Sequence, residues 1–513
     1  MAGSPVNFRT FIVVALSVGA AVFCVYVYSL NYIVGTVFAS AYTATIVFIT
    51  IMVIYKYITK RTKLRYAVAA ALSFVLGISA FAVGAYTADD WRKGEAYNGN
   101  CSVLGRVCAV DFSSGDYKFV IEDLYLNGKP VVGKMRVAVL PAENNAAEHV
   151  ATGDKLSFEA SVRHVKLISG FRINGNAYRT NIRYNVSVRG DALSVVFGAP
   201  SVLEKFTAGL RALLVKNMGE KYGNIAFSML TGDKYALDGE IKDYFTAAGL
   251  GHIMAVSGLH IGFLILVLNF VLNRLSKKVR FPIILAAIAG YTVLADFSPS
   301  VVRAVIMAVI SGFAVFVGGR KDLLSSLLCA FSLILAVKPM YLFDAGFLLS
   351  FAAIFGIALF ANSIRLFMAK RGAHNKIASG IGASVSVSVA VTPVQTYFFG
   401  QIQLLSVIAN VILLPFVSVV FITLVATLPI AAIPYCGGIL HASKYLLVAL
   451  DYAAQGIAAV PFTVITVKTS AAVFLCYPVM FCASGYFMMN KGKTAVILYS
   501  AAVCVLICYI CAA

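Results

Sequence analysis

Long apolar runs separated by short basic loops constrain this chain more than any other feature. The first three, residues 11–30, 33–54 and 66–88, each approach the length that crosses the hydrocarbon core of a bilayer. Later runs of this kind cover residues 281–297, 300–318, 323–339, 345–368, 376–399, 404–432 and 494–512. Because 60% of the residues are hydrophobic and only 12% are charged, we predict a polytopic α-helical membrane protein with about 11–12 spans.

The basic residues predict how the chain is oriented. A dense basic stretch, Lys56–Arg65, follows the second run, and the positive-inside rule places it and the N-terminus in the cytoplasm. Later clusters at Arg274–Arg280, Arg320–Lys321 and Lys370–Arg371 fall on the same predicted side. Much of the net charge of +20 is then explained by topology, so it is weak evidence for a nucleic-acid ligand.

Residues 89–190 are the one sizeable stretch that reads as soluble, and the topology places them outside the cytoplasmic membrane. Short runs such as YKFVIEDLYL and KMRVAVLP alternate polar with β-branched residues, and turn residues separate them. Five or six short strands of this kind predict a small β-barrel or sandwich. Cys101 and Cys108 are candidates for a disulfide, which the compartment permits, whereas most other cysteines lie in apolar runs.

The later strands of this β-domain interleave cations with aromatic rings. Such a surface suits single-stranded nucleic acid, because cations neutralise phosphates while rings stack on bases. A solvated or lipid-facing basic surface has the same composition, so that alternative stays open. The candidate DNA-binding residues are Arg163, Lys166, Phe171, Arg172, Tyr178, Arg179, Arg183, Tyr184 and Arg189.

The chain divides into four predicted regions. Three transmembrane helices occupy 1–88 and the extracytoplasmic β-domain 89–190. Residues 191–248 read as amphipathic interfacial helices, because EKFTAGLRALLVKN and GEIKDYFTAAG have helical spacing but are too polar to span. The remaining region, 249–513, is predicted to be a transmembrane domain with polar residues inside its spans. Within it, residues 404–432 form either one kinked span or a broken pair of spans.

The segment 249–262 concentrates polar groups at the start of a membrane-length run. His252, Ser257 and His260 lie there among several glycines, and buried polar groups in a membrane normally face a protein interior or a wet cavity. One interpretation is neutral packing histidines. The other is a Ser257–His260 catalytic pair at i and i+3, although no orienting group or oxyanion site is evident.

Other polar residues within the later spans extend the candidates for a passage or for structural contacts: Asp296, Arg303, Asp344, Gln395 and Asn410. A purely structural Asp–Arg pair is the simpler explanation for Arg303. No phosphate-binding G-x-x-x-x-G-K-[ST] motif occurs, since Phe487 takes the place of its first glycine, and no H-E-x-x-H occurs. We therefore predict no nucleotide hydrolysis, no metal and no cofactor.

Several segments together resemble the ComEC family, the inner-membrane channel of bacterial natural transformation. The motifs are LTGDK at 230–234, GLGHIMAVSGLHIG at 249–262, SPSVVRAVIM at 298–307, KPMYLFDAGFLLSFAAIFGIAL at 338–359 and TPVQTYFFGQIQLLSVIANVILLP at 392–415. The resemblance covers roughly 200–430 in detail, and it implies passage of one DNA strand across the bacterial inner membrane. It also implies an OB-like β-domain, a separate ATP-driven cytoplasmic motor and an outer DNA receptor as partners.

One departure from the family is large. Many members end in a metallo-β-lactamase-like domain with an H-x-H-x-D-H motif, and no such motif occurs here. The resemblance thus suggests a short form that acts as a channel and not as an enzyme. Two alternatives are a secondary transporter of a small anion, which broken spans would also suit, and an intramembrane serine hydrolase using Ser257.

Overall fold

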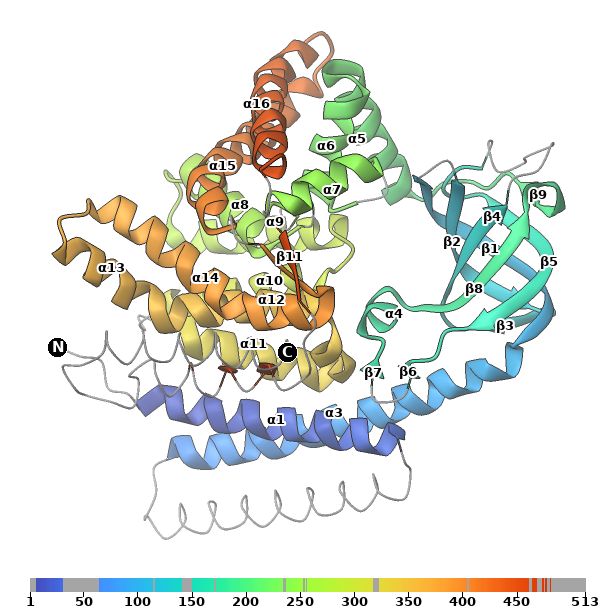
Figure 1. Cartoon of the computed structure of the whole chain (residues 1–513), viewed down its shortest axis with the longest axis horizontal. Coiled ribbons are helices and arrows are strands. Elements are labelled where there is room, and N and C mark those ends of the chain that lie inside the picture. Colours follow the sequence, from blue (N-terminus) through green and yellow to red (C-terminus); the bar gives the residue numbers. More distant parts are fainter. Residues whose placement is uncertain are drawn as a thin grey trace. The chain divides into compact units, whose positions relative to one another are not determined.

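The structure is a computed structural model of the whole chain (Figure 1). It describes residues 6–30, 64–113, 116–140, 150–169, 172–233, 237–251, 254, 256–316, 323–403, 406–460, 464–467, 473, 474, 476, 477 and 480. Contacts divide the chain into two compact units. Unit 1 comprises Met1–Gly209 and Leu328–Asp344, and unit 2 comprises Leu210–Leu327 and Ala345–Ala513. The predicted spans at 33–54 and 494–512 lie outside the described residues.

Two long apolar helices pack side by side among the described residues of unit 1. Helix α1 (Val6–Leu30) packs along α3 (Leu64–Lys93), which the 3-10 turn η1 (Gly94–Tyr97) continues into the β-domain. Gly84 on α3 lies against Val25 on α1, where a Cβ would come within 2.6 Å of a Val25 methyl carbon, so glycine permits this close approach. The indole of Trp91 near the end of α3 donates to the Val165 carbonyl at 2.7 Å and ties the helix to the strands.

The predicted β-domain is a closed barrel. Strands β1 (Gly99–Ser113), β2 (Asp116–Leu126), β4 (Lys134–Leu140), β8 (Ile182–Arg189) and β5 (Lys155–His164) follow one another around it, and β1 pairs with β5 to close the ring. The β4–β8 pair is parallel, whereas the other pairs in the ring are antiparallel. Strands β3 (Lys129–Val131) and β9 (Ser194–Val196) add to β2 and β5.

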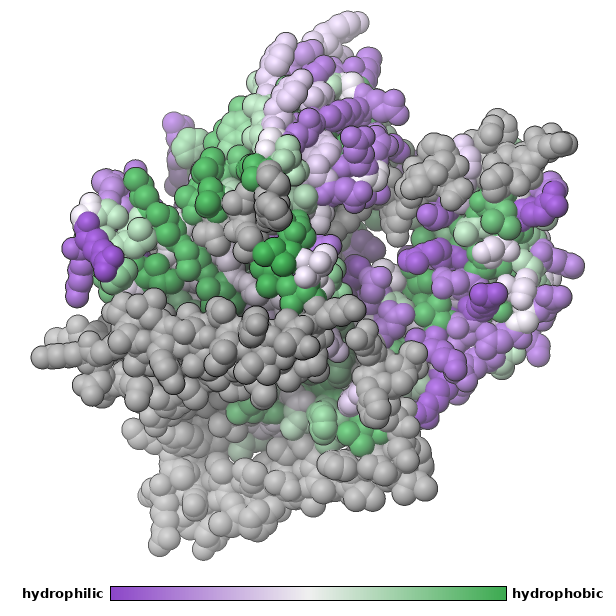
Figure 2. All heavy atoms as spheres, viewed as in Figure 1, coloured by the Kyte–Doolittle hydropathy of each residue, from purple (hydrophilic) through white to green (hydrophobic). Residues whose placement is uncertain are grey.

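Alternating side chains fill the barrel. Along β5 the buried positions Leu156, Phe158 and Val162 alternate with exposed polar residues, as period-2 patterning requires. They join Phe119, Ile121, Met135 and other buried residues in one core. Figure 2 shows mostly hydrophilic residues over the visible face of the barrel and a broad hydrophobic area over α14 (Asn375–Phe399) and α15 (Ser406–Ala431). A short insertion between β5 and β8 carries β6 (Ile168–Ser169), β7 (Arg172–Ile173) and α4 (Gly175–Thr180).

The segment predicted as amphipathic forms three helices. They are α5 (Val202–Met218), α6 (Glu220–Thr231) and α7 (Gly239–Ala247). Their buried faces join residues of α15 (Ser406–Ala431) and α16 (Leu440–Ala458) in the main core of unit 2, so these helices are part of a packed bundle. Asp451 of α16 is 1% exposed and accepts from Lys221 Nζ of α6 at 2.7 Å.

The helices of the membrane region follow the predicted runs closely. They are α8 (Gly258–Val271), α9 (Lys277–Leu294), α10 (Pro299–Phe316), α11 (Leu323–Val337), α12 (Ala345–Gly356), α13 (Asn362–Lys370) and α14 (Asn375–Phe399). A π-helical turn, η5 (Ile357–Ala361), joins α12 to α13, while η4 (Pro339–Phe343) precedes α12. Helix α15 is continuous through Pro415, which settles the open alternative for 404–432 as one helix.

By length and composition, four helices among the described residues can cross a membrane: Ala70–Tyr97, Ala345–Lys370, Asn375–Phe399 and Ile408–Ala431. The chain is accordingly a membrane protein with a small β-barrel, and the larger number of spans stays a prediction. The segment 249–262 is not the start of a membrane-length helix as predicted. Helix α8 has only 14 residues, so it is about 21 Å long, and about 30 Å are needed to cross the hydrocarbon core.

Candidate functional site

The first turn of α8 is held by a reciprocal cap between Ser257 and His260. Ser257 has an extended backbone and occupies the N-cap position, and its Oγ accepts from the Leu259 amide at 3.3 Å. His260 is 3% exposed, and its Nδ1 accepts from the Ser257 amide at 3.0 Å. Ser257 Oγ lies 3.2 Å from the same Nδ1. These contacts satisfy amides that a helix start leaves without partners.

This geometry favours a structural role for the pair over a catalytic one. Nδ1 of His260 already accepts from a backbone amide, so its lone pair is not reserved for the Ser257 hydroxyl proton. The imidazole packs edge-on against Phe421 of α15 with ring centroids 4.6 Å apart. The two residues at i and i+3 do not share one helix, because Ser257 precedes α8 and caps it. His252 lies outside the described residues.

Arg303 approaches the same turn from α10. It is 4% exposed, its Nη1 donates to the Ser350 carbonyl, and its guanidinium lies over the Phe351 ring at 5.7 Å. A Cβ on Gly258, the first residue of α8, would be 2.8 Å from Arg303 Nη2. Thus α8, α10 and α12, far apart in sequence, meet around one buried guanidinium.

No carboxylate among the described residues forms an ion pair with Arg303, and its Nε has no hydrogen-bond partner there. The simpler explanation of a structural Asp–Arg pair is therefore not what the structure shows. Asp296 is exposed in the turn after α9, with φ 48°, and Asp344 pairs with Arg179. Gln395 is half-buried on α14, and Asn410 is 9% exposed on α15 with Oδ1 unpartnered among the described residues.

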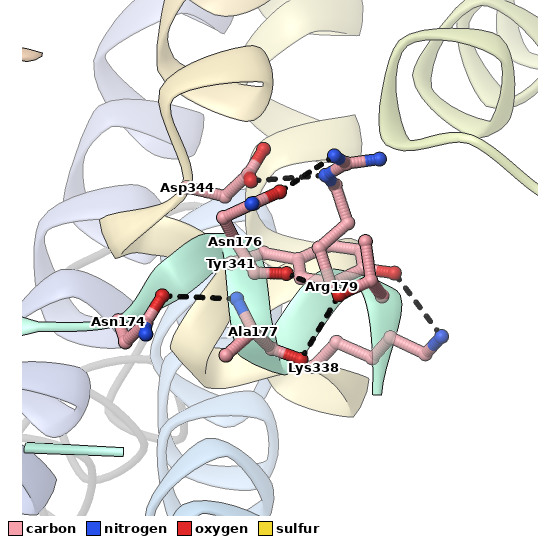
Figure 3. A network of polar contacts seen from close by, with 8 residues as sticks. Asn174, Asn176, Ala177, Arg179, Lys338, Tyr341 and Asp344 are labelled. Atoms are coloured by element: carbon pink, nitrogen blue, oxygen red, sulfur yellow. Dashed lines mark hydrogen bonds and ion pairs between the residues drawn. The ribbon is translucent and has the colours of Figure 1, made fainter. Parts of the chain in front are cut away.

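Asp344 pairs with Arg179, one of the predicted DNA-binding residues (Figure 3). The carboxylate is 3% exposed and accepts from Arg179 Nε at 3.1 Å, while Arg179 Nη2 donates to Asn176 Oδ1 at 2.8 Å. Gly175 packs directly on the backbone of Phe343 and Asp344, and a Cβ there would overlap that backbone. Arg179 thus holds α4 against η4. Because the buried Asp344 carboxylate neutralises the Arg179 guanidinium, a DNA phosphate would have to compete with it for that charge.

Three of the predicted DNA contacts are turned inward. Tyr184 is 0% exposed in the barrel core, and burial raises its pKa to about 12. Arg183 is 8% exposed, pairs with Asp90 at 2.9 Å, and lies 4.8 Å over the Trp91 ring. Tyr178 packs against Trp91, so burial also raises its pKa to about 12. The prediction that Arg183 and Tyr184 contact DNA is wrong, because neither side chain reaches the surface.

The remaining predicted cations differ in what the structure shows of them. Arg163 and Lys166 are exposed, and Arg189 is exposed but paired with Asp191 at 3.1 Å. The backbone of Arg172 lies in β7, and Phe171 lies outside the described residues. Of the predicted aromatic residues, none that the structure describes is exposed beside these cations.

The barrel exposes a basic row in which the predicted Arg163 is joined by two residues that the sequence interpretation did not single out. Arg136 on β4 is in register with Asn185 on β8, and Asn185 is in register with Arg163 on β5. All three residues are exposed, and neither arginine is ion-paired among the described residues. We call Arg136, Asn185 and Arg163 the cross-strand row. The alternation in KMRVAVL places Arg136 opposite the buried Met135 and Val137 and could have indicated it.

The predicted disulfide between Cys101 and Cys108 is also wrong. The two cysteines are not joined to each other, and both lie on the single strand β1. An extended strand separates residues seven positions apart by about 23 Å, whereas disulfide-bonded Cα atoms lie within about 7 Å. Among the described residues, no group of three or more His, Cys, Asp or Glu side chains could hold a metal ion.

Comparisons with known proteins cover the helical part of the chain. The family model described as "Competence protein" matches residues 229–491, which is just over half of the chain and includes α8, Arg303 and α12. The chain is 25% identical over 264 residues to "ComE operon protein 3" of Bacillus subtilis (strain 168), covering 49% of this chain and 32% of that protein.

A second relative is "Competence protein ComA" of Neisseria gonorrhoeae. It is 24% identical over 267 residues, which cover 49% of this chain and 38% of that protein. The alignments thus span less than two fifths of the curated relatives' own length. No solved structure matches the chain.

Proposed function

The chain belongs to the competence protein family, and from that premise we propose that it conducts single-stranded DNA across the bacterial cytoplasmic membrane during natural transformation. The family match carries this proposal, since it covers the helices that hold the α8 cap and Arg303. The Neisseria gonorrhoeae relative is named a competence protein, and DNA uptake is the role that we propose for this chain.

The barrel is proposed to be an OB-like domain that captures the strand outside the membrane. If β1, β2, β4, β5 and β8 are counted as five main strands, their order around the ring is one, two, three, five, four, with three and five parallel. A five-stranded Greek-key barrel of the OB type binds oligonucleotides on its strand-two and strand-three face and on the adjoining loops. In this chain β2 and β4 provide that face.

The cross-strand row supports capture through phosphate contacts. Arg136 lies on β4, on the expected binding face, and Arg163 lies two strands away across Asn185. Both guanidiniums are exposed and have no carboxylate partner among the described residues, so they can exchange counterions for DNA phosphates. Because the predicted stacking rings Tyr178 and Tyr184 are packed inside, the proposed capture depends on charge more than on stacking.

Passage through the membrane region requires help from other proteins. Each phosphate entering a cytoplasm at negative potential is opposed by about 2.3 kcal/mol per 100 mV. The sequence has no phosphate-binding nucleotide loop, so we propose a separate ATP-driven motor in the cytoplasm and an outer DNA receptor as partners. Polar side chains of the helical unit, including Arg303, Gln395 and Asn410, are proposed to line or shape the passage.

Binding of DNA to the full chain in lipid nanodiscs tests the capture step. Fluorescence anisotropy of a labelled single-stranded oligonucleotide is measured across a salt series for wild type and for Arg136→Ala/Arg163→Ala. Loss of two phosphate contacts should weaken binding and reduce the slope of log affinity against log salt by about 1.4. Lys155→Ala, which removes an exposed cation of β5 outside the cross-strand row, serves as the matched control.

The result separates the proposed surface from general basicity. If the double variant changes the slope by no more than twice the change that Lys155→Ala causes, the cross-strand row is not the capture site. If wild type does not bind at low salt, the barrel is not a DNA receptor at all.

A secondary transporter of a small anion is the second candidate. The short helix α8 begins beside the buried Arg303, and discontinuous helices of this kind hold anionic substrate groups in transporters. Variants of the cross-strand row that abolish DNA uptake can be tested for uptake of a small anion. Anion uptake that persists in them would favour this candidate.

A further inference from the structure

We propose that Arg303 and the first turn of α8 form a binding site for a phosphate group, occupied in the working protein by a phosphodiester of the passing strand. The identity of this phosphate rests on the proposed function, whereas the anion site itself rests on the geometry of unit 2 alone. The site is distinct from the cross-strand row of the barrel, which belongs to unit 1.

The guanidinium of Arg303 is a buried positive charge without a carboxylate partner among the described residues. Arg303 is 4% exposed, and among the described residues no Asp or Glu forms an ion pair with it. A buried cation without a partner is costly, and natural proteins retain such groups where a ligand completes them. Nη1 donates to the Ser350 carbonyl and the guanidinium lies over the Phe351 ring, which hold the group in place, but no carboxylate in the described part of the chain compensates its charge.

The remaining N–H donors of Arg303 lie on one edge of the guanidinium. With Nη1 committed to Ser350, the opposite edge of the guanidinium consists of Nε and Nη2. Nε is buried and has no hydrogen-bond partner among the described residues, and Nη2 lies against Gly258. Two adjacent N–H donors in one plane match two oxygens of a phosphate, the bidentate geometry for which arginine is suited.

Nη2 of Arg303 lies beside the N-terminus of α8. Gly258 is the first residue of α8, a helix of 14 residues with no acidic residue in its first turn. The amide end of a helix carries a partial positive charge and attracts anions. Placing a guanidinium beside it is unfavourable unless an anion lies near both, so the two features together predict an anion where either alone would not.

Gly258 makes the close approach possible. A side chain here would place Cβ 2.8 Å from Nη2, which is shorter than a normal contact, so the arginine would have to move. Gly258→Ala therefore displaces the guanidinium while keeping its charge. Alanine is a better helix former than glycine, so the variant is expected to fold.

Phosphate binding to the purified full chain tests the site. The chain is held in maltoside micelles, which contain no phosphate, and thermal unfolding is followed while inorganic phosphate replaces chloride at constant ionic strength. We expect phosphate to raise the Tm of wild type, and Arg303→Met to abolish this rise. In Gly258→Ala the apparent phosphate affinity should fall about tenfold to a hundredfold. Arg274→Met, which removes an exposed cation elsewhere in unit 2, should keep the wild-type response.

A competition arm identifies the source of the phosphate. A short single-stranded oligonucleotide should reduce the effect of inorganic phosphate, whereas the same sequence with an uncharged methylphosphonate backbone should not. Failure of the charged oligonucleotide to compete would overturn the assignment to a DNA strand. An unchanged phosphate response in Arg303→Met or Gly258→Ala would overturn the site itself. Either failure is distinguishable from failure of the proposed function, because capture is read from the salt dependence of the barrel variants.

Discussion

Two buried arginines show how differently the two units of this chain use charge. Arg183 in unit 1 is 8% exposed and is neutralised by Asp90 at 2.9 Å, with Asn181 Oδ1 accepting from its Nε at 3.3 Å. Arg303 in unit 2 is 4% exposed, and among the described residues its guanidinium has a carbonyl acceptor and an aromatic ring but no carboxylate partner. The charge of Arg183 is neutralised within the fold, whereas the charge of Arg303 remains available to bind an anion.

Removal of the neutralising carboxylate should have the largest effect. Asp90→Ala leaves the Arg183 guanidinium buried without its ion pair, which should lower the free energy of unfolding by about 3 kcal/mol. Trp91, the single tryptophan of the chain, lies under Arg183 and reports the change by fluorescence during thermal unfolding. Asp191→Ala breaks the exposed pair with Arg189 and should cost under about 0.5 kcal/mol. Equal effects of the two variants would contradict the comparison.

A smaller loss is expected where unit 1 joins its short helix α4 to η4. Gly175→Ala would drive a Cβ into the Phe343 backbone, and overpacking of this kind costs about 2 kcal/mol. The measurement is again thermal unfolding followed by Trp91, which packs against Tyr178 of α4. Gly209→Ala is the control, because no atom lies within 4 Å of a Cβ at that position, and it should be neutral or stabilising. A neutral result at Gly175 would show that α4 is not held there.

In unit 2, loss of the α8 cap should be modest and should not abolish function. Ser257→Ala removes the side-chain acceptor of the Leu259 amide, which should cost about 1 kcal/mol of stability. Thermal unfolding of the purified chain and DNA uptake in cells are both measured. Ser257→Asn, which retains a capping side chain, should recover most of the stability. Complete loss of uptake in a stably folded Ser257→Ala chain would instead indicate a nucleophile.

The smallest effect expected is a pH dependence of unit 1. Both ring nitrogens of His164 are buried without a hydrogen-bond partner among the described residues, between Trp91 and Tyr184. Burial lowers the pKa of His164; the nearby Glu95 opposes this, and the Arg183 charge adds to it. Because the folded state then binds the proton less readily than the unfolded chain, stability is complete above about pH 6.5 and falls as the pH drops below it.

His164→Leu tests this origin directly. The midpoint of the Trp91 fluorescence transition should become less dependent on pH between about pH 5 and 7, the range in which an ordinary histidine titrates. A wild-type midpoint that rises on acidification would contradict the sign of the shift.

Local sequence patterns predicted the elements well and the tertiary roles of charged residues poorly. The apolar runs predicted α9, α10, α11 and α14 to within a few residues, and alternation predicted a small barrel or sandwich, because both signals depend on local periodicity. The basic-aromatic pattern failed for Arg183 because its burial depends on Asp90 and Trp91 of α3, which come from an earlier part of the chain.

The candidate site shows the same limit. Ser257 and His260 could be singled out from their polarity within an apolar run, but the break in the helix before Gly258 depends on the capping geometry. Likewise the isolation of Arg303 from any described carboxylate depends on how α8, α10 and α12 pack. Asp344 was equally visible in the sequence, yet it pairs with Arg179, far from it along the chain.

The most direct test of the central claim is the uptake of labelled DNA into cells. The gene for this chain is deleted from its bacterium and restored as wild type or as Arg136→Ala/Arg163→Ala, and the DNA protected from external nuclease in the cytoplasm is counted. The account predicts that deletion abolishes cytoplasmic DNA, that wild type restores it and that the double variant restores far less. Unchanged cytoplasmic DNA in the deletion strain would contradict the proposal that this chain conducts the strand.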